Sequence, residues 1–500
     1  MKMKYISILP ILILLLNTSC NNWLDVKSST ELDRDDLFSS ENGFGEALIG
    51  VYSQLSDASL YGGELTWGLL DVLGGQYVDV KGNYNKFSTS SYKQNSTDRD
   101  DNALGIVDQL WKGLYAQIAN LNSILESIDE HKDVFNGDNY SVIKGEAIGL
   151  RAFLHLELLR MYSMDYENAK DKEAIPFVEG LTTQVAPMLT ADQALTKIIT
   201  ELKIAKELLQ QDPILLGTVP SEVLASQPGG KYADYSIEPW HNRRFHFNYF
   251  AVQAALARAY QRKGDRKNAL DASEEVIRYQ ASRFPWVKKS NLTTISNSSY
   301  NTCENQDRTF ATEHIFALNI RSLESNIQGY LTTVGGTNNV LNSDVTKFND
   351  SDLRRQFLYT YVGEKYLLNK FCQPEVVATF FKYRMPVMRI GEMYLIAAES
   401  SDDLLKAASY LDQLKSQRGI TSNLMEEAED GNFLLEDVSY EVMTEYQREF
   451  CGEGQVWFYY KRNRITAIPN TIELSGLDMF VFDIPEDEIT YGGRKNNFEE

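Results

Sequence analysis

Residues 255–270, with the sequence ALARAYQRKGDRKNAL, describe two helices joined by a tight turn. Ala257 and Ala269 are small enough to let the two helices approach closely, and Tyr260 can fill the groove between them. Gly264 suits the turn because glycine readily adopts the left-handed backbone that often ends a helix. The stretch therefore predicts a helix–turn–helix unit. We expect its helices over residues 248–262 and 266–279.

The order of leucine, small residue, tyrosine, glycine and alanine in this stretch resembles a tetratricopeptide helix pair. Its second half departs from that pattern, because Ser273 and Val276 stand where an aromatic residue and an alanine are usual. A weaker echo begins at Ile390, and a third surrounds Ile148. Together the three units favour a mostly α-helical fold, with a core of stacked helix pairs of the α-solenoid kind.

Most of the remaining long segments repeat apolar residues every three or four positions, which is the period of an α-helix. Thr190 and Gln193 have the spacing of a capping box and open a helix that Pro213 stops. Only residues 315–320 and 480–484 have a weak strand pattern. We expect further helices over residues 43–56, 102–129, 141–162, 387–399, 401–418 and 440–460.

Two long insertions, residues 57–101 and 283–384, interrupt the helical pattern and are rich in aromatic side chains. Irregular connections of this length are uncommon in compact domains unless they serve a function. Flat, amphipathic rings bind ligands at a low cost in entropy, although a ring in a loop can equally pack into a small local core. We therefore expect the insertions to form a binding surface. The ligand-binding candidates are Trp67, Tyr77, Tyr84 and Trp286.

The N-terminus has the features of an export signal. Lys2 and Lys4 precede an apolar run over residues 6–16, which is too short to span a bilayer. Cys20 follows it, as in bacterial lipoprotein signals whose cysteine is lipidated, although Asn17 replaces the usual leucine. An ordinary secretory signal with an incidental cysteine is the alternative. We expect residues 1–19 to be a signal peptide, Cys20 to carry lipid and residues 20–500 to form a single domain.

Composition narrows the classes of partner. The net charge of −21 argues against nucleic acid, whose binding rests on basic patches, and against adsorption to anionic lipid head groups. Beyond Cys20 the chain has only Cys303, Cys372 and Cys451, which is too few for a disulfide framework. No CxxC pair or other metal-ligand spacing occurs, so the sequence predicts no metal ion and no cofactor.

Short segments such as RIGEMYLIAAE at residues 389–399 and REFCGEG at 448–454 lie along the chain in an order that resembles the SusD/RagB family of Bacteroidota outer-membrane lipoproteins. The nearest match is RIGEMYLIAAE at residues 389–399, which resembles the family segment R-x-A-E-x-Y-L-x-x-A-E. The chain departs from the family at Asp483, where a proline is usual, and after Gly454, where the usual Arg and Asp are absent. The other matching segments are WLD at 23–25, GEAIGLRAF at 145–153, IPF at 175–177, FAVQAALARA at 250–259, REFCGEG at 448–454 and FDIPEDEI at 482–489.

This resemblance implies a lipid-anchored protein of the outer membrane that faces the cell exterior. Such a protein would bind a nutrient, with an oligosaccharide or other glycan as the first choice, and deliver it to a SusC-like TonB-dependent transporter. The resemblance also implies that the family motifs are mainly structural. We therefore expect Glu392, Glu399, Arg448 and Glu449 to pack helices and form ion pairs.

Signatures of catalysis are missing: the sequence has no HExxH, no G-x-S-x-G and no phosphate-binding loop, so we expect no enzymatic activity. Glu445, Glu449 and Glu453 share a helical spacing, which usually marks a solvated stripe, and Arg448 is available to pair with them. Three alternatives stay open. They are a peptide-binding member of the same family, a tetratricopeptide lipoprotein that serves as an assembly scaffold at the outer membrane, and an α-helical glycosidase. The five histidines are scattered: His131, His155, His241, His246 and His314.

Overall fold

The structure is a computed structural model. It describes residues 34–78, 80, 82–88, 92–217, 242–291, 307–331, 341, 351–356, 359–362, 365–371, 381–468 and 477–495. The predicted signal peptide, Cys20, the WLD motif, Cys303 and Cys372 lie outside the described residues. Among the described residues, no helix combines the length and the apolar character needed to cross a membrane.

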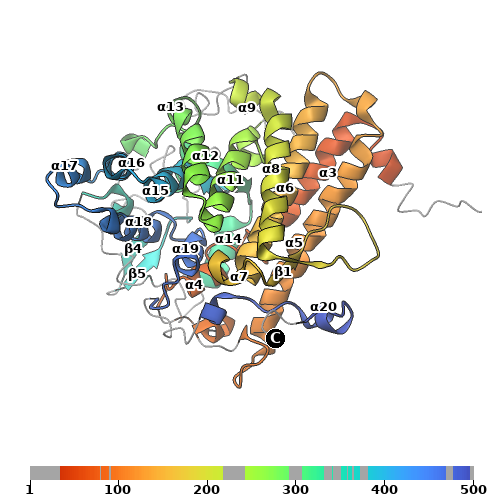
Figure 1. Ribbon diagram of the computed structural model, residues 1–500, viewed down its shortest axis with the longest axis horizontal. Coiled ribbons are helices and arrows are strands. Elements are labelled where there is room, and N and C mark those ends of the chain that lie inside the picture. Colours follow the sequence, from red (N-terminus) through yellow and green to blue (C-terminus); the bar gives the residue numbers. More distant parts are fainter. Residues whose placement is uncertain are drawn as a thin grey trace, which may run out of the picture.

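The protein is mostly α-helical, and helices that follow one another along the chain pack side by side (Figure 1). Packing neighbours run from α3 to α5, α6, α8, α11, α12, α15 and α16, so the helices form one continuous array. The long helices are α3 Glu41–Leu55, α5 Asp101–Ile128, α6 Asn139–Tyr162, α8 Ala191–Leu208, α11 Tyr249–Lys263, α12 Arg266–Arg278, α15 Ile390–Ser400, α16 Leu404–Gln417, α18 Leu435–Glu449 and α19 Gln455–Asn463.

Shorter helices connect this array. The short α-helices are α4 Leu69–Leu73, α7 Tyr166–Ala169, α9 Pro213–Leu216, α13 Gln280–Arg283, α14 Leu323–Leu331, α17 Leu424–Glu429 and α20 Glu486–Thr490. The 3₁₀ turns are η2 Gly82–Ser88, η4 Lys132–Val134, η5 Leu209–Gln211, η6 Arg243–Phe245, η7 Lys289–Asn291, η8 Ala311–Glu313, η9 Leu353–Gln356 and η10 Leu477–Phe480.

The helix–turn–helix predicted from residues 255–270 is the pair α11 and α12. Gly264 ends α11 in the left-handed region with φ +76°, and Asp265 then caps α12 by accepting a hydrogen bond from the amide of Asn268. Ala257 and Ala269 are fully buried, as the close approach of the two helices requires. Gly149 on α6 has the same role, because a Cβ there would lie 2.9 Å from Val252 on α11. Small residues thus set the spacing of the array.

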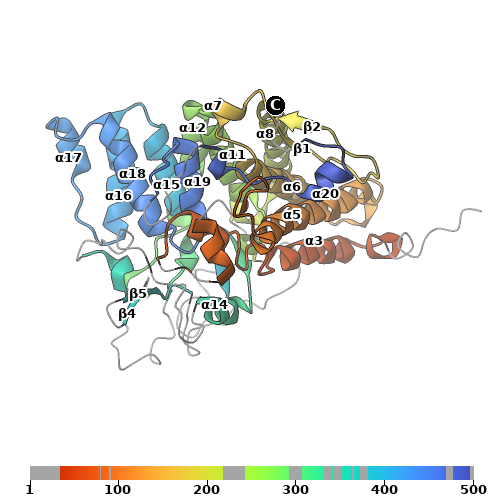
Figure 2. The same ribbon diagram turned by 90° about the horizontal axis from the view of Figure 1, so that it is seen from below.

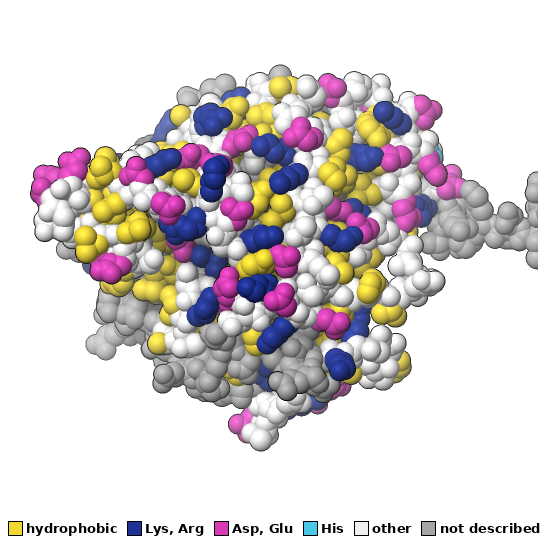
Figure 3. Space-filling model, viewed as in Figure 1, with side chains coloured by type: hydrophobic (Ala, Val, Ile, Leu, Met, Phe, Trp, Pro, Cys, Tyr) yellow, Lys and Arg dark blue, Asp and Glu magenta, His cyan; other side chains and the backbone are white. Residues whose placement is uncertain are grey.

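One hydrophobic core runs through the array, from Phe38 to Ile484. On the face shown in Figure 3, lysines, arginines and acids are interspersed over the helices, and acids gather at the outer end of α17. The described surface of this face therefore carries no large patch of one sign.

Strands are few and short. The predicted strand at residues 315–320 is confirmed as β3 His314–Asn319, which pairs antiparallel with β6 Arg384–Arg389. The predicted strand at 480–484 is wrong: η10 ends at Phe480, and an irregular segment follows it. Figure 2 shows the hairpin of β4 and β5, together with α14, to one side of the helices. The remaining strands are β1 Glu173–Pro176, β2 Met188–Thr190, β4 Tyr359–Val362 and β5 Lys365–Leu368.

The predicted helices are largely confirmed, with two corrections. The helix expected over 440–460 is two helices, α18 and α19, because Gly452 and Gly454 turn the chain with φ +85° and +71°. A Cβ on Gly454 would also lie 2.4 Å from the carbonyl oxygen of Leu65. The helix expected from residue 387 begins at Ile390, because the residues before it form β6. Every residue of β6 is buried, so the alternation that marks a strand is missing.

Candidate functional site

An open groove of about 560 Å³ lies between the C-terminal end of α3, η6 and the segment from β3 to α14. Its volume falls in the range of roughly 300–1,000 Å³ that is typical of small-ligand sites. Residue 57, which begins the first predicted insertion, and residues 318–322, which belong to the second, both line the groove. We call it the α3–β3 groove. Its lining residues are Ile49, Tyr52, Ser53, Ser56, Asp57, Phe245, His246, Leu318, Asn319, Ile320, Arg321 and Ser322.

The floor of the groove is held by a buried carboxylate, Glu146 on α6. Tyr52 donates its hydroxyl to Glu146 at 2.6 Å, the Nδ1 of His246 lies 2.7 Å from the same carboxylate, and Arg243 donates at 2.5 Å. Burial works to raise the pKa of Glu146, but the charges of Arg243 and His246 outweigh it and lower the pKa to about 2. An ionised carboxylate only accepts hydrogen bonds, so His246 donates from Nδ1 and its Nε2 is left for the groove.

Three further polar side chains of the α3–β3 groove have no partner among the described residues. Ser53, Asn319 and Arg321 are exposed, and their side chains form no hydrogen bond or ion pair within the described part of the chain. Hydroxyl, amide and guanidinium groups together offer both donors and acceptors. Tyr52 and Phe245 add ring surface to the wall. The groove therefore suits a ligand with several hydroxyl groups and some apolar surface.

The four aromatic residues predicted to bind ligand do not line this groove. Trp67, Tyr77 and Tyr84 belong to the hydrophobic core and are 3%, 2% and 9% exposed. The hydroxyl of Tyr84 donates to Glu64, which fixes the ring in place. Trp286 is half-buried, with its ring centroid 5.1 Å from that of Tyr394. These contacts assign a packing role to the rings, and their contact with ligand stays a prediction.

Sequence reasoning missed most of the α3–β3 groove. Its polar residues come from three distant segments, so no local motif joins Ser53 to His246 or Arg321. The available signals were weak: His246 stands in the loop before α11, and Arg321 follows the predicted strand at 315–320. Both positions are ends of elements, where ligand-binding residues often occur.

A second polar cluster lies around Glu449, at the end of α18. Arg389 donates to its carboxylate at 2.7 Å, Arg354 at 2.8 Å and Arg418 at 2.5 Å. Burial works to raise the pKa of Glu449, and Arg418 and Arg389 hold it well below its ordinary value. We call this cluster the Glu449 network. Its other members are Glu313, Asp352, Lys370, Glu445 and Glu453.

The Glu449 network corrects one prediction and agrees with another. Glu445, Glu449 and Glu453 are not a solvated stripe, because they are 0%, 0% and 4% exposed and each pairs with a buried cation. The arginines that cover them come from remote segments, which the helical spacing could not reveal. The ion-pair roles implied by the family resemblance are present. Glu392 pairs with Arg258, Glu399 with Arg462, and Arg448 with Glu445.

No group of three or more His, Cys, Asp or Glu side chains in the described part of the chain is arranged to hold a metal ion. The acids of the Glu449 network are instead bound to arginine and lysine. The described part of the chain is thus an array of stacked helix pairs that carries the buried Glu449 network and the open α3–β3 groove.

Comparison with known families identifies the chain. The model of the SusD family matches residues 234–497, and a second model, described as starch-binding associating with outer membrane, matches residues 22–225. The first match alone covers more than half of the sequence. The chain therefore belongs to the SusD/RagB family. A search of curated proteins finds no match to this sequence.

Solved structures share the fold at low sequence identity. A SusD superfamily protein from Bacteroides vulgatus is 18% identical, with a TM-score of 0.67 over 92% of this chain and 99% of its own. A SusD-like carbohydrate binding protein from the same species is 19% identical, with a TM-score of 0.63 over 90% of this chain and 96% of its own. Surface glycan-binding protein A from Bacteroides uniformis is 16% identical, with a TM-score of 0.60 over 92% of this chain and 99% of its own.

Proposed function

We propose that this protein is a cell-surface lipoprotein that binds a nutrient glycan in the α3–β3 groove and delivers it to a SusC-like TonB-dependent transporter of the outer membrane. The observation that carries the proposal is the groove itself. It has about 560 Å³ of space, and Ser53, Asn319 and Arg321 face it without internal partners. These side chains are exposed to solvent, so a ligand can replace water on them without breaking a contact within the protein.

Glycan chemistry fits this groove. Each sugar hydroxyl both donates and accepts a hydrogen bond, so it can pair with an amide, a guanidinium or the Nε2 of His246. The less polar faces of a sugar ring can pack on Tyr52 and Phe245, which line the same groove. Binding and release need no bond to be made or broken, and the mechanism is capture followed by transfer.

Relatives favour a glycan over a peptide. One family model that matches the chain is described as starch-binding, and two solved structures with the same fold are named as carbohydrate- or glycan-binding proteins. The same model is described as associating with outer membrane. This description supports the outer membrane as the location. That residues 20–500 form a single domain, held outside the cell by lipid on Cys20, is part of the proposal and rests on the sequence.

The binding part of the proposal is tested with an array of glycans and peptides applied to the mature protein. We expect glycan hits, and we expect Arg321→Ala to weaken them. Arg464→Ala is the matched control, because Arg464 is also an exposed arginine but lies at the end of α19, away from the groove. Hits limited to peptides would support the peptide-binding alternative. Turnover of any glycan would contradict pure binding and support a glycosidase.

The transfer part of the proposal has its own test. Affinity purification from membranes should recover a TonB-dependent transporter, and mass spectrometry should find lipid on Cys20. A Cys20→Ala variant should lose the lipid and leave the membrane fraction. Recovery of barrel-assembly components without a transporter would support the scaffold alternative.

A further inference from the structure

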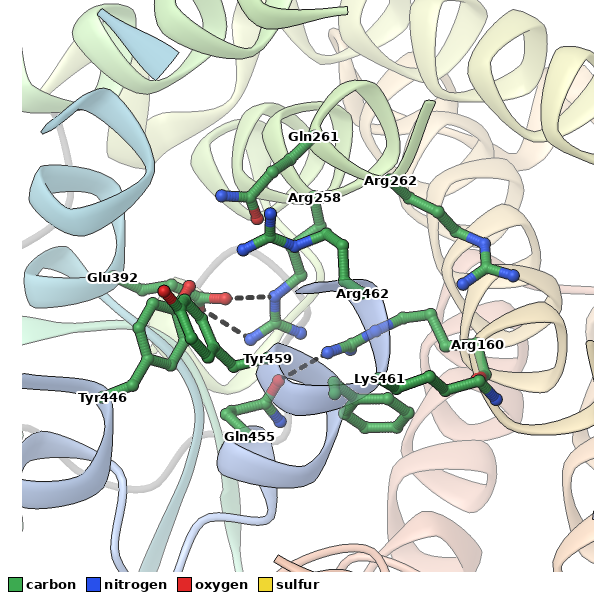
Figure 4. A pocket seen from close by; sticks show the side chains of 11 residues that line it. Arg160, Arg258, Gln261, Arg262, Glu392, Tyr446, Gln455, Tyr459, Lys461 and Arg462 are labelled. Carbon is green, nitrogen blue, oxygen red and sulfur yellow. Dashed lines mark hydrogen bonds and ion pairs between the residues drawn. The ribbon is translucent and has the colours of Figure 1, made fainter. Parts of the chain in front are cut away.

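Two regions outside the α3–β3 groove gather side chains that the proposed function does not use. The first is internal, where α11 and α19 meet the end of α6, and Figure 4 shows Arg258 facing Glu392, to which it donates at 2.7 Å. Arg262 and Lys461 donate there to the carbonyls that end α6, whose partial negative charge compensates both cations. These contacts hold helices together, so this region belongs to the scaffold. The second region is an exposed loop, residues 180–187, at one end of the array.

The exposed loop has the sequence GLTTQVAP and carries no charged side chain, although 24% of the whole chain is charged. The next charged residue after it is Asp192. Its two larger apolar side chains face solvent, since Leu181 is 44% exposed and Val185 is 57% exposed. We call it the uncharged loop. Apolar side chains that gather at a surface without charges between them are typical of a contact with a protein or a membrane.

The uncharged loop lies beside the point at which the described chain begins. The amide of Leu181 donates to Glu126 at 2.6 Å, and Arg34, the first described residue, pairs with the same carboxylate at 3.3 Å. Figures 1 and 2 both place the start of α3 and this loop at the end of the array opposite α17. Cys20 lies 14 residues before Arg34, and a chain of that length reaches at most about 50 Å. A lipid on Cys20 would therefore tether the body at this end.

The acids that border the uncharged loop are already paired with cations. An ion pair has no net charge, so these acids do not add to the repulsion between a chain of net charge −21 and anionic head groups. A contact through apolar side chains needs no electrostatic attraction. The pairs are Glu126 with Arg34, Glu179 with Lys197 and Glu488 with Arg494.

The C-terminal segment lies against the other side of the uncharged loop. Arg494 donates to the carbonyl of Ala186 at 3.1 Å, which holds the two segments together. Tyr491 precedes Arg494 by three residues and is exposed. Tyrosine is enriched where proteins meet a membrane surface, because its ring is apolar and its hydroxyl is polar. The loop and Tyr491 therefore supply the side chains that an interfacial contact uses.

We propose that the uncharged loop contacts the lipid surface to which Cys20 tethers the protein, with Leu181 and Val185 among the head groups and Tyr491 beside them. The inference rests on the proposed lipid anchor. Two apolar side chains are too few to bind a membrane alone, but a tether raises their effective concentration at its surface. Helix α3 runs from this end to the α3–β3 groove over 15 residues, about 22 Å, so the contact leaves the groove clear of the lipid.

The test uses residues 21–500 with a histidine tag before residue 21, and phosphatidylcholine vesicles that contain a nickel-chelating lipid. The tag replaces the lipid of Cys20, so the loop contact is measured whether or not Cys20 is lipidated, and mass spectrometry decides the lipidation separately. An environment-sensitive nitrobenzoxadiazole probe is attached at Val185→Cys. Leu405→Cys, an exposed position on α16 at the other end of the array, is the matched control. Both proteins carry Cys303→Ser and Cys372→Ser, whereas Cys451 is buried and stays.

We expect the probe at position 185 to shift its emission to the blue on the vesicles and to be quenched by doxyl-labelled lipids, and the probe at position 405 to do neither. Leu181→Asp should reduce the shift at position 185, because a charge is costly at the lipid surface. Leu434→Asp, at the α17 end, should leave it unchanged. The same emission at both positions would overturn the proposal. A shift at position 185 that requires an added membrane protein and is absent on lipid alone would also overturn it, in favour of a protein partner.

Discussion

The Glu449 network and the α3–β3 groove gather polar side chains in opposite ways. In the network, Arg354, Arg389 and Arg418 converge on one carboxylate, and every one of these groups is buried. In the groove, Asn319 and Arg321 are exposed and have no partner within the described chain. Polar groups that satisfy one another hold distant segments together, whereas polar groups left open are available to a ligand. We therefore expect the network to stabilise the fold and the groove to bind the ligand.

The largest expected effect comes from breaking the network. Glu449→Gln removes the charge that three buried arginines share, and leaving such charges unpaired costs about 3–5 kcal/mol. Urea unfolding should therefore show a large loss in the free energy of unfolding. Glu436→Gln, at an exposed position on the same helix, should change it by less than about 0.5 kcal/mol. Equal stabilities of the two variants would refute the structural role of the network.

A variant at the floor of the groove should lose both stability and affinity for glycan. Glu146→Gln removes the charge that Arg243 and His246 share, although Arg243 keeps Asp212 at 2.8 Å. We expect a loss of stability of about 2 kcal/mol, because charged hydrogen bonds weaken. We also expect weaker glycan binding, because His246 loses the partner that fixes its ring. Unfolding and calorimetric titration measure the two effects, and a variant with unchanged affinity would show that His246 does not contact ligand.

The stability of the first insertion should depend on pH. Burial raises the pKa of Asp71 to about 7, although the amides of Gly452 and Gly454 donate to its carboxylate. A raised pKa means that the folded state retains the proton longer, so this contribution is complete at low pH and is lost as the pH rises through about 7. We expect Tm to fall between about pH 4 and 7, and the fall to be smaller in Asp71→Asn. An equally steep fall in both proteins would exclude Asp71 as its source.

At low pH Glu146 should make the stability change with pH in the opposite direction to Asp71. Its pKa is lowered to about 2, so its ionised form contributes stability above the ordinary value of 4.5, and that contribution is lost as the pH falls toward 2. Acid unfolding of Glu146→Gln, which has no such charge to lose, should depend less on pH in this range. A wild-type acid transition identical to that of the variant would contradict the assignment.

The sequence predicted the helical array better than it predicted the site. The spacing of Ala257, Tyr260 and Gly264 is local, so the α11–α12 pair could be recognised before any contact was known. The strand β6 was missed because all of its residues are buried and no alternation marks it. Composition identified the aromatic insertions but could not distinguish a ring in the core, such as Trp67, from a ring facing a ligand. The pairing of β6 and the burial of Trp67 both depend on contacts between distant segments, which a local sequence pattern does not show.

The groove variants should have the smallest effect on stability and a clear effect on binding. The most direct measurement is calorimetric titration of a glycan identified on the array into the wild-type protein and into the double variant Asn319→Ala/Arg321→Ala, with Glu449→Gln beside them. We expect the double variant to lose affinity about tenfold or more, as for two hydrogen bonds of about 1 kcal/mol each, with stability within about 0.5 kcal/mol of wild type. We expect Glu449→Gln to lose stability and keep its affinity. Unchanged affinity in the double variant would contradict the α3–β3 groove as the binding site.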